Sequence, residues 1–80
     1  MSNFDYKAPA ELFAAHGRSG LRYRRFLHAA DAVQYAIEKL PANLLLGSRL
    51  EVEEQHYDAK NIRALYESAN YPLTRKLASS

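Results

Sequence analysis

The chain has 80 residues, no cysteine and a formal net charge of +2 at pH 7. This length predicts one small domain over residues 1–80 with loose termini at about 1–7 and 74–80. The lack of cysteine excludes a disulfide framework and a thiolate metal site. No apolar run is long enough for a signal peptide or a membrane-spanning helix, so we expect a cytoplasmic protein without membrane contact.

Positive and negative charges are concentrated in different halves of the sequence. Basic residues outnumber acidic ones over residues 1–27, and acidic residues outnumber basic ones over residues 48–70. The asymmetry indicates one of two arrangements, which are a basic binding face or two halves that pair with each other in the fold.

The first predicted element is a short helix over about Pro9 to His16. Proline suits the first helical position, Glu11 falls in the first turn, and glycine ends the apolar side. The following Gly17-Arg18-Ser19-Gly20 predicts a turn, because two glycines flank a polar pair.

The alternation of apolar and basic residues over 21–26 predicts a strand. Its predicted core face consists of Leu21 and Tyr23, and its predicted solvent face of Arg22 and Arg24. Phe26 breaks this parity. A bulge at Arg24 or Arg25, or the end of the strand, would return it to the core.

From Ala29 the apolar period changes to that of a helix, and Asp31 in the first turn and Lys39 in the last suit the helix dipole. Pro41 ends or kinks this helix, and Ala42 to Leu46 predicts one more irregular turn. The stripe that should face the core consists of Ala29, Val33, Ala36, Ile37 and Leu40.

Arg49 to Glu53 alternates cleanly and predicts a strand with Leu50 and Val52 inward. A polar turn follows, and His56-Tyr57 predicts a very short third strand. Asp58 is a suitable N-cap for a last helix that ends near Asn70 and Pro72. The predicted apolar side of this helix consists of Ile62, Leu65, Tyr66 and Ala69.

The predicted fold class is α+β, with a small two- or three-stranded sheet and three helices in the order α-β-α-β-(β)-α. The long crossover from Leu27 to Ser48 favours parallel pairing of the two main strands over antiparallel pairing. If these strands are neighbours, Arg22 and Arg24 share the solvent face with Glu51 and Glu53, and their charges pair within the fold.

Nucleic-acid binding is one candidate function, because basic and aromatic residues interleave in Arg22-Tyr23-Arg24-Arg25-Phe26. Two arguments weigh against it: Tyr23 and Phe26 would face opposite ways on a regular strand, and the arginines have carboxylates to pair with. The GxxG spacing of residues 17–20 matches the loop of KH domains, but an ordinary turn fits better. The candidate nucleic-acid or anion surface consists of Arg18, Arg22, Arg24, Arg25, Arg75 and Lys76.

Binding of a protein partner, or of a second copy in a homodimer, is the other candidate function. It depends on large apolar residues in a connecting turn and near the last helix, where tyrosine in particular is favoured at interfaces. The alternative is that these residues complete the core. The candidate partner surface consists of Leu44, Leu45, Leu46, Tyr66, Tyr71 and Leu73.

The sequence offers little for catalysis. His16, His28 and His56 lack metal-ligand spacing, and no serine lies in a nucleophile motif. The carboxylates near Glu51 to Asp58 are typical of a charge-pairing surface, because nothing apolar nearby would separate their pKa values. We therefore predict no catalytic residue, no metal site and no cofactor, and a protein that is not an enzyme.

Three segments, YRRFLHAADAVQYAIEKLP, LEVEEQHYD and IRALYESANYPL, resemble short bacterial proteins of unknown function with a strand, helix, hairpin, helix order. The resemblance covers about Arg22 to Leu73 and contains no motif that carries chemistry. It implies a hairpin at Glu53 to Tyr57 and a bacterial cytoplasmic source. It carries over no site residues.

The sequence as a whole therefore predicts a small non-catalytic binding or adaptor protein that acts through self-association or a protein partner. Weak nucleic-acid binding through the basic segment Arg18 to Arg25 is the alternative. The choice depends on whether Arg22 and Arg24 really pair with Glu51 and Glu53.

Overall fold

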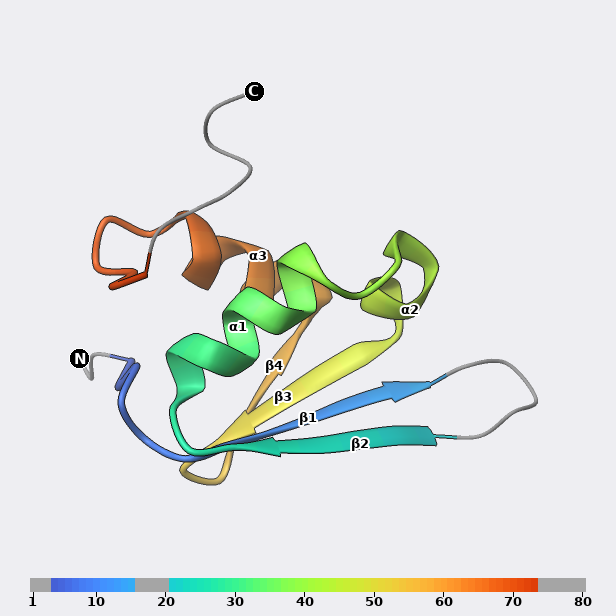
Figure 1. Cartoon of the computed structure of the whole chain (residues 1–80), viewed down its shortest axis with the longest axis horizontal. Helices are drawn as coiled ribbons and strands as arrows, with labels where there is room; N and C mark the ends of the chain where they lie inside the picture. The colour runs from blue at the N-terminus through green and yellow to red at the C-terminus, as the bar shows by residue number, and fades with distance from the viewer. Residues whose placement is uncertain (1–3, 16–20, 74–80) are drawn as a thin grey trace.

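The computed structural model describes residues 4–15 and 21–73, apart from the side chains of residues 15, 21 and 22. These ranges form four strands and three helices (Figure 1), in the order β1 (Ala10–Ala15), β2 (Leu21–Phe26), α1 (Ala29–Glu38), α2 (Ala42–Leu46), β3 (Ser48–Val52), β4 (Gln55–Asp58) and α3 (Ala59–Glu67). The α+β class is confirmed. The predicted element order and the smaller sheet are wrong, because the first element of the described residues is a strand and these residues form a four-stranded sheet.

The sheet is antiparallel throughout, with the strand order β2-β1-β3-β4. The predicted pairing of the two main strands is therefore wrong. β2 and β3 do run in the same direction, since each is antiparallel to β1, but β1 lies between them and separates them by roughly 10 Å. Arg22 and Arg24 are thus not cross-strand neighbours of Glu51 and Glu53, and that predicted charge pairing is also wrong.

β1 occupies the residues for which a helix was predicted, apart from Pro9 and His16, and that prediction is wrong over Ala10–Ala15. Alanine, glutamate and leucine each favour helices. However, Ala10, Leu12 and Ala14 are all buried at a spacing of two, which is the period of a strand. As a central strand β1 pairs on both sides, and this tertiary pairing outweighs the local helix propensity. His16 and the predicted turn at residues 17–20 lie outside the described residues.

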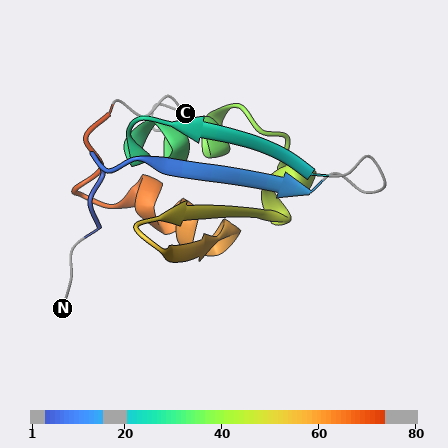
Figure 2. The same ribbon diagram turned by 90° about the horizontal axis from the view of Figure 1, so that it is seen from below.

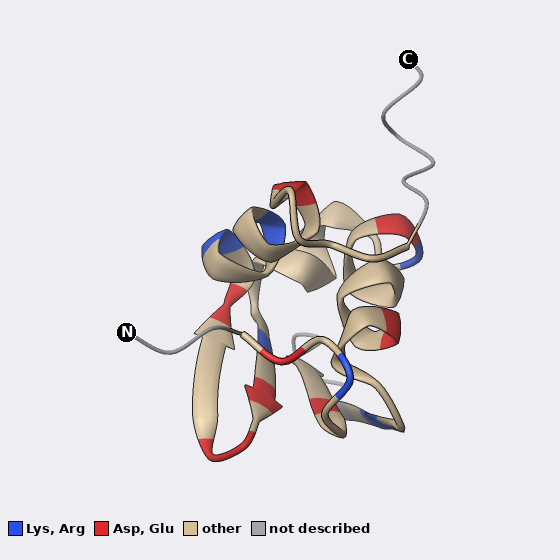
Figure 3. Cartoon of the chain, turned by 90° about the vertical axis from the view of Figure 1, so that its left-hand side faces the viewer, with Lys and Arg blue, Asp and Glu red and all other residues tan. Residues whose placement is uncertain are grey.

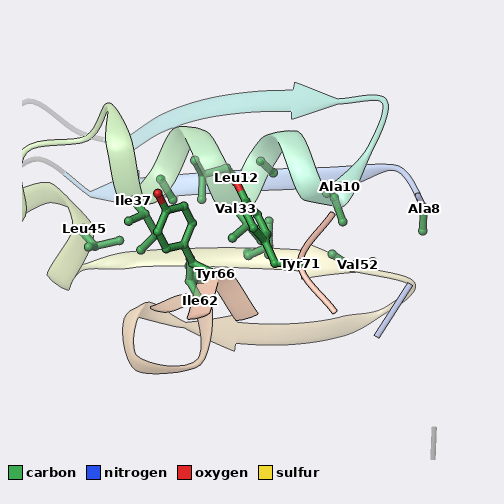
Figure 4. Packing of buried hydrophobic residues seen from close by; sticks show 14 residues of the cluster. Ala8, Ala10, Leu12, Val33, Ile37, Leu45, Val52, Ile62, Tyr66 and Tyr71 are labelled. Carbon is green, nitrogen blue, oxygen red and sulfur yellow. The ribbon is translucent and has the colours of Figure 1, made fainter. Parts of the chain in front are cut away.

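The three helices lie on one face of the sheet and leave the other face without a helical layer (Figures 1 and 2). The core fills the space between the helices and the sheet, and its largest fully buried side chains are Leu50, Ile62 and Val33. Figure 4 shows that the helices and the sheet contribute side chains to one cluster. Four of the five predicted stripe residues of α1 are buried, and Leu40 is half-buried, so the predicted orientation of this helix is confirmed.

The segment before β1 packs against the body of the protein. Phe4 and Tyr6 are half-buried, their rings meet edge to face, and the Tyr6 hydroxyl donates to the Leu65 carbonyl at 2.7 Å. The carbonyls of Ala8 and Tyr6 accept from the first two backbone N–H groups of α1, at 2.6 and 2.8 Å. Those N–H groups have no partner inside the helix, so this segment caps α1.

Helix α3 begins as predicted, because the Asp58 side chain accepts from the Asn61 N–H at 3.0 Å. Ile62 and Tyr66 are buried and Leu65 is half-buried, whereas Ala69 is exposed and lies beyond the end of the helix. The Tyr66 hydroxyl donates to Glu38 Oε2 at 2.6 Å and so links α3 to the end of α1.

The predicted third strand is present as β4, which pairs with β3 through a two-residue turn at Glu53-Glu54. Both turn residues have positive φ angles, 52° and 70°. Such a turn matches the twist of the two strands, but it normally contains asparagine and glycine. Glutamate in the left-handed region has a steric cost, so this hairpin is not optimised for stability.

Candidate functional site

The face of the sheet that the helices leave uncovered is the main candidate site. Its residues alternate along each strand with the buried ones, and Figure 2 looks directly onto it. We call this set the open face; its described side chains are those of Glu11, Phe13, Tyr23, Arg25, Arg49, Glu51, His56 and Asp58.

An aromatic pair lies on the β2 side of the open face. Phe13 and Tyr23 are opposite each other in the strand register, with ring centroids 5.1 Å apart. The Arg49 guanidinium lies over the Phe13 ring, 5.0 Å from its centroid. Tyr23 is 53 % exposed, an unusually open position for a large aromatic side chain. The pair therefore offers apolar and cation–π contacts to a ligand on this face.

Charged side chains form a second row across the open face. The register places Arg25, Glu11, Glu51 and His56 side by side on the four successive strands. Glu51 Oε2 lies 3.1 Å from Arg49 Nη2 and 3.4 Å from His56 Nε2. Glu11 faces both Arg25 and Glu51 in the register. Two carboxylates thus lie between Arg25 and His56, and the open face is mixed in charge.

The Tyr23 hydroxyl donates a hydrogen bond to Glu11 Oε2 at 3.0 Å. This hydrogen bond raises the pKa of Tyr23 above its ordinary value, since the phenolate could no longer donate. Partial loss of hydration and the negative charge of Glu11 act in the same direction, and the charge of Arg25 opposes them. The phenol therefore stays protonated throughout the neutral range.

Replacing Glu11 with glutamine should lower the pKa of Tyr23 toward its ordinary value, because the charge that opposes the phenolate is removed. A pH titration of the Tyr23 ring carbon by NMR measures this directly. Glu67→Gln on the exposed side of α3 is the control and should leave the Tyr23 pKa where it is. An equal Tyr23 pKa in the wild type and in Glu11→Gln would contradict the hydrogen bond.

A groove of about 370 Å³ lies between β2 and α1, on the helix side of the sheet. Its lining includes Leu12 and Ala14 from β1, Tyr23 from β2, and Tyr35 and Leu40. Arg24 also lines it, and its guanidinium lies 4.8 Å from the centroid of the Tyr35 ring and 5.4 Å from that of Phe26. Stacking holds this cation in place at the edge of the sheet.

The predicted face assignment of β2 is wrong for Tyr23 and Arg24. Phe26 and Arg24 pair with Ala10 and Leu12, whose side chains face the helices, whereas Tyr23 lies on the open face. No bulge is needed, because the register with β1 is continuous from one end of β2 to the other. β2 is an edge strand, so Arg24 can lie on the helix side and still reach solvent.

The candidate nucleic-acid residues are not brought together by the described part of the structure. Arg24 and Arg25 lie on opposite faces of β2, and both are exposed. The side chain of Arg22, and all of Arg18, Arg75 and Lys76, lie outside the described residues.

The candidate partner residues lie mostly in the core. Leu44, Leu45, Tyr66 and Tyr71 are between 3 and 7 % exposed, so the folded chain cannot present them as a surface. Leu73 is half-buried, and Leu46 is 81 % exposed. The alternative interpretation, that these residues complete the core, describes the first four.

The acidic residues near the β3–β4 turn line a hollow of about 250 Å³ together with Arg25. Figure 3 shows acidic positions at this hairpin tip, and β1 lies between the hairpin and β2. Among residues 4–15 and 21–73, no group of three or more His, Asp or Glu side chains has an arrangement that could hold a metal ion.

Sequence reasoning missed Phe13, Glu11 and Arg49 as members of the site. The signal for the first two is the alternation of small or apolar residues with Glu11 and Phe13 from Ala10 to Ala14, which the predicted helix concealed. Arg49 starts a correctly predicted strand, but its stacking on Phe13 depends on a strand pairing that the sequence did not indicate.

Comparison with protein-family models, curated proteins and solved structures gave no match. The resemblance to short bacterial proteins thus stays a prediction. Within the described part of the chain, none of the helices has the length and apolar character needed to cross a membrane.

Proposed function

We propose that this protein is a non-catalytic binding protein whose open face contacts a protein partner. The observation that carries the proposal is the uncovered sheet face, on which Phe13 contacts Tyr23 on one side and the Arg49 guanidinium on the other. Tyrosine, phenylalanine and arginine are the residue types enriched in protein interfaces. An exposed aromatic centre with charges around it is the typical composition of such a surface.

The charge of the open face favours a protein over a nucleic acid. Its described cations are Arg25 and Arg49, and they are outnumbered by Glu11, Glu51 and Asp58 when His56 is neutral. A phosphate backbone would meet these carboxylates at short range, and affinity for nucleic acid depends mainly on cations. A protein partner can instead match charges of both signs.

Nucleic-acid binding is the second candidate, because one specific observation favours it. The half-buried Phe13 and the exposed Tyr23 form a pair of aromatic rings of the kind used in base stacking, and β2 pairs with β1 and not with the strand that carries Glu51. The argument from paired arginines is thereby weakened, and Phe13 in place of Phe26 supplies the second ring beside Tyr23. Its expected signature is a steep loss of affinity as the salt concentration rises.

Photocrosslinking in cells that make the protein tests the proposal. A photoreactive benzoyl-phenylalanine is placed at position 23 on the open face, or at position 60 on the exposed side of α3 as the control. We expect a discrete protein adduct from position 23 and not from position 60. The yield should fall several-fold when Arg49→Glu is added, because this change reverses a charge beside the aromatic pair.

The mass of the adduct distinguishes the alternatives. A crosslinked second copy of the chain would identify the partner as a homodimer and support protein binding. An adduct that nuclease digests would replace the proposal with the nucleic-acid alternative. No adduct at position 23, or the same adducts from both positions, would contradict it.

A further inference from the structure

Strand β2 forms an unpaired edge of the sheet. It has six residues, contains no proline, and within the described residues pairs only with β1. Alternate backbone N–H and C=O groups of such a strand point outward and can bind another strand. β4, at the opposite edge, is shorter and leads directly into α3. The longer and better binding edge is therefore β2.

Features on both sides of this edge suit a strand added next to β2. Side chains of an added strand would alternate between the open face, beside Tyr23 and Arg25, and the helix side, beside Arg24. On the helix side they would meet the 370 Å³ groove between β2 and α1. Leu27, which follows β2, is 81 % exposed and adds apolar surface at the end of the edge.

The charge of the edge indicates what can occupy it. Arg24 and Arg25 are exposed, and neither forms an ion pair with any described residue. An antiparallel pair of β2 strands from two copies would bring Arg24 and Arg25 close to the same two cations of the other copy, which is unfavourable. Residues 74–80 of the chain carry Arg75 and Lys76 and would be repelled as well. The complementary occupant is acidic.

We propose that β2 binds an extended acidic segment of a partner protein, which adds to the sheet as a fifth strand. Backbone hydrogen bonds to the free edge supply the affinity, and Arg24 and Arg25 select glutamate or aspartate at positions on the two faces of the added strand. Apolar side chains of the segment occupy the groove beside Tyr35. This inference rests on the proposed function, since it specifies how the partner of the open face is held.

The test uses a short peptide in which pairs of glutamates alternate with pairs of valines, so that both faces of the strand carry both residue types. It is titrated into the ¹⁵N-labelled full chain at physiological salt. We expect amide shift changes centred on β2 and slower hydrogen exchange at every second β2 residue. A peptide with lysine in place of glutamate should bind at least tenfold more weakly. Two further peptides are N-methylated, one at the odd-numbered and one at the even-numbered residues. One of them should lose binding and the other should bind almost as the unmodified peptide does, because only every second N–H group of an added strand faces β2.

A charge exchange separates specific recognition from loss of folding. The double variant Arg24→Glu/Arg25→Glu should bind the glutamate peptide at least tenfold more weakly and should gain binding to the lysine peptide. Arg63→Glu, an equivalent change on the exposed side of α3, is the control and should bind as the wild type does. Gain of binding to the lysine peptide requires a folded edge.

Three outcomes would overturn the inference. They are equal affinity for the two peptides, shifts away from β2, and binding that both N-methylated peptides retain. Protection of β2 that grows with protein concentration in the absence of peptide would show that a second copy occupies the edge. If these results occur while crosslinking from position 23 still yields a discrete protein adduct, the strand addition fails and the proposed function stands.

Discussion

Replacing Leu50 with alanine is expected to lower the free energy of unfolding by about 2–5 kcal/mol. Leu50 is completely buried in β3, between the paired strands β1 and β4 and beneath the helices. Its truncation removes apolar contacts and leaves a cavity that the surrounding strands can only partly fill. The total stability of small domains is often only about 5 kcal/mol, so this loss is a large part of it.

Urea unfolding of the variant and the wild type measures this effect. Leu46→Ala is the matched control, because Leu46 is 81 % exposed and its truncation should change the stability by less than about 0.5 kcal/mol. Equal midpoints for the two variants would contradict the position of Leu50 in the core.

Replacing Glu53-Glu54 with Asn-Gly is expected to raise the free energy of unfolding by about 1–2 kcal/mol. Both residues have positive φ, which glycine adopts without a steric penalty and asparagine adopts more readily than glutamate. The change also removes two negative charges that lie close to Glu51 and Glu11 around the same hollow.

The double variant Glu53→Gln/Glu54→Gln separates the two causes, since it removes the charges and keeps the unfavourable backbone. We expect it to give only a small part of the gain in the urea midpoint. A variant with Asn-Gly that is no more stable than this glutamine variant would show that the turn is not of the type described.

Local sequence patterns predicted those elements whose period is set by contact with the core. The stripe of α1, the alternation of β3 and the Asp58 cap of α3 each follow from neighbouring residues, and all three are present. The same reasoning predicted a polar turn followed by a short strand at His56-Tyr57, although it gave no reason to expect two positive φ angles at Glu53 and Glu54.

The main error of the sequence-based prediction was the helix expected where β1 lies, and this error affected the predicted arrangement of the whole sheet. Ala10–Ala15 is composed mostly of helix-forming residues, and only pairing with strands distant in the sequence makes it extended. Without this central strand, β2 and β3 were expected to be neighbours, and Tyr23 was expected to face the core. Strand order is a long-range property that one sequence specifies weakly.

The candidate site was correspondingly only in part predictable. The interleaving of basic and aromatic residues in the sequence drew attention to Tyr23, Arg24 and Arg25. The ring that contacts Tyr23, however, belongs to Phe13 on β1. Four of the six expected interface residues are core residues, because apolar residues in a connecting helix or after a last helix fit either role. Whether such a residue is buried or exposed decides between the two roles, and this is known only once the fold is known.

The central claim is that the open face and the outer edge of β2 are accessible to a partner. Paramagnetic relaxation by a soluble gadolinium chelate, measured by NMR on the free protein, tests this most directly. The account predicts strong relaxation of the Tyr23 ring and of alternate β2 amides, and little relaxation of the Leu12 and Leu50 methyl groups. The claim would be contradicted if the Tyr23 ring and all β2 amides were relaxed as little as the amides of the central strand β1.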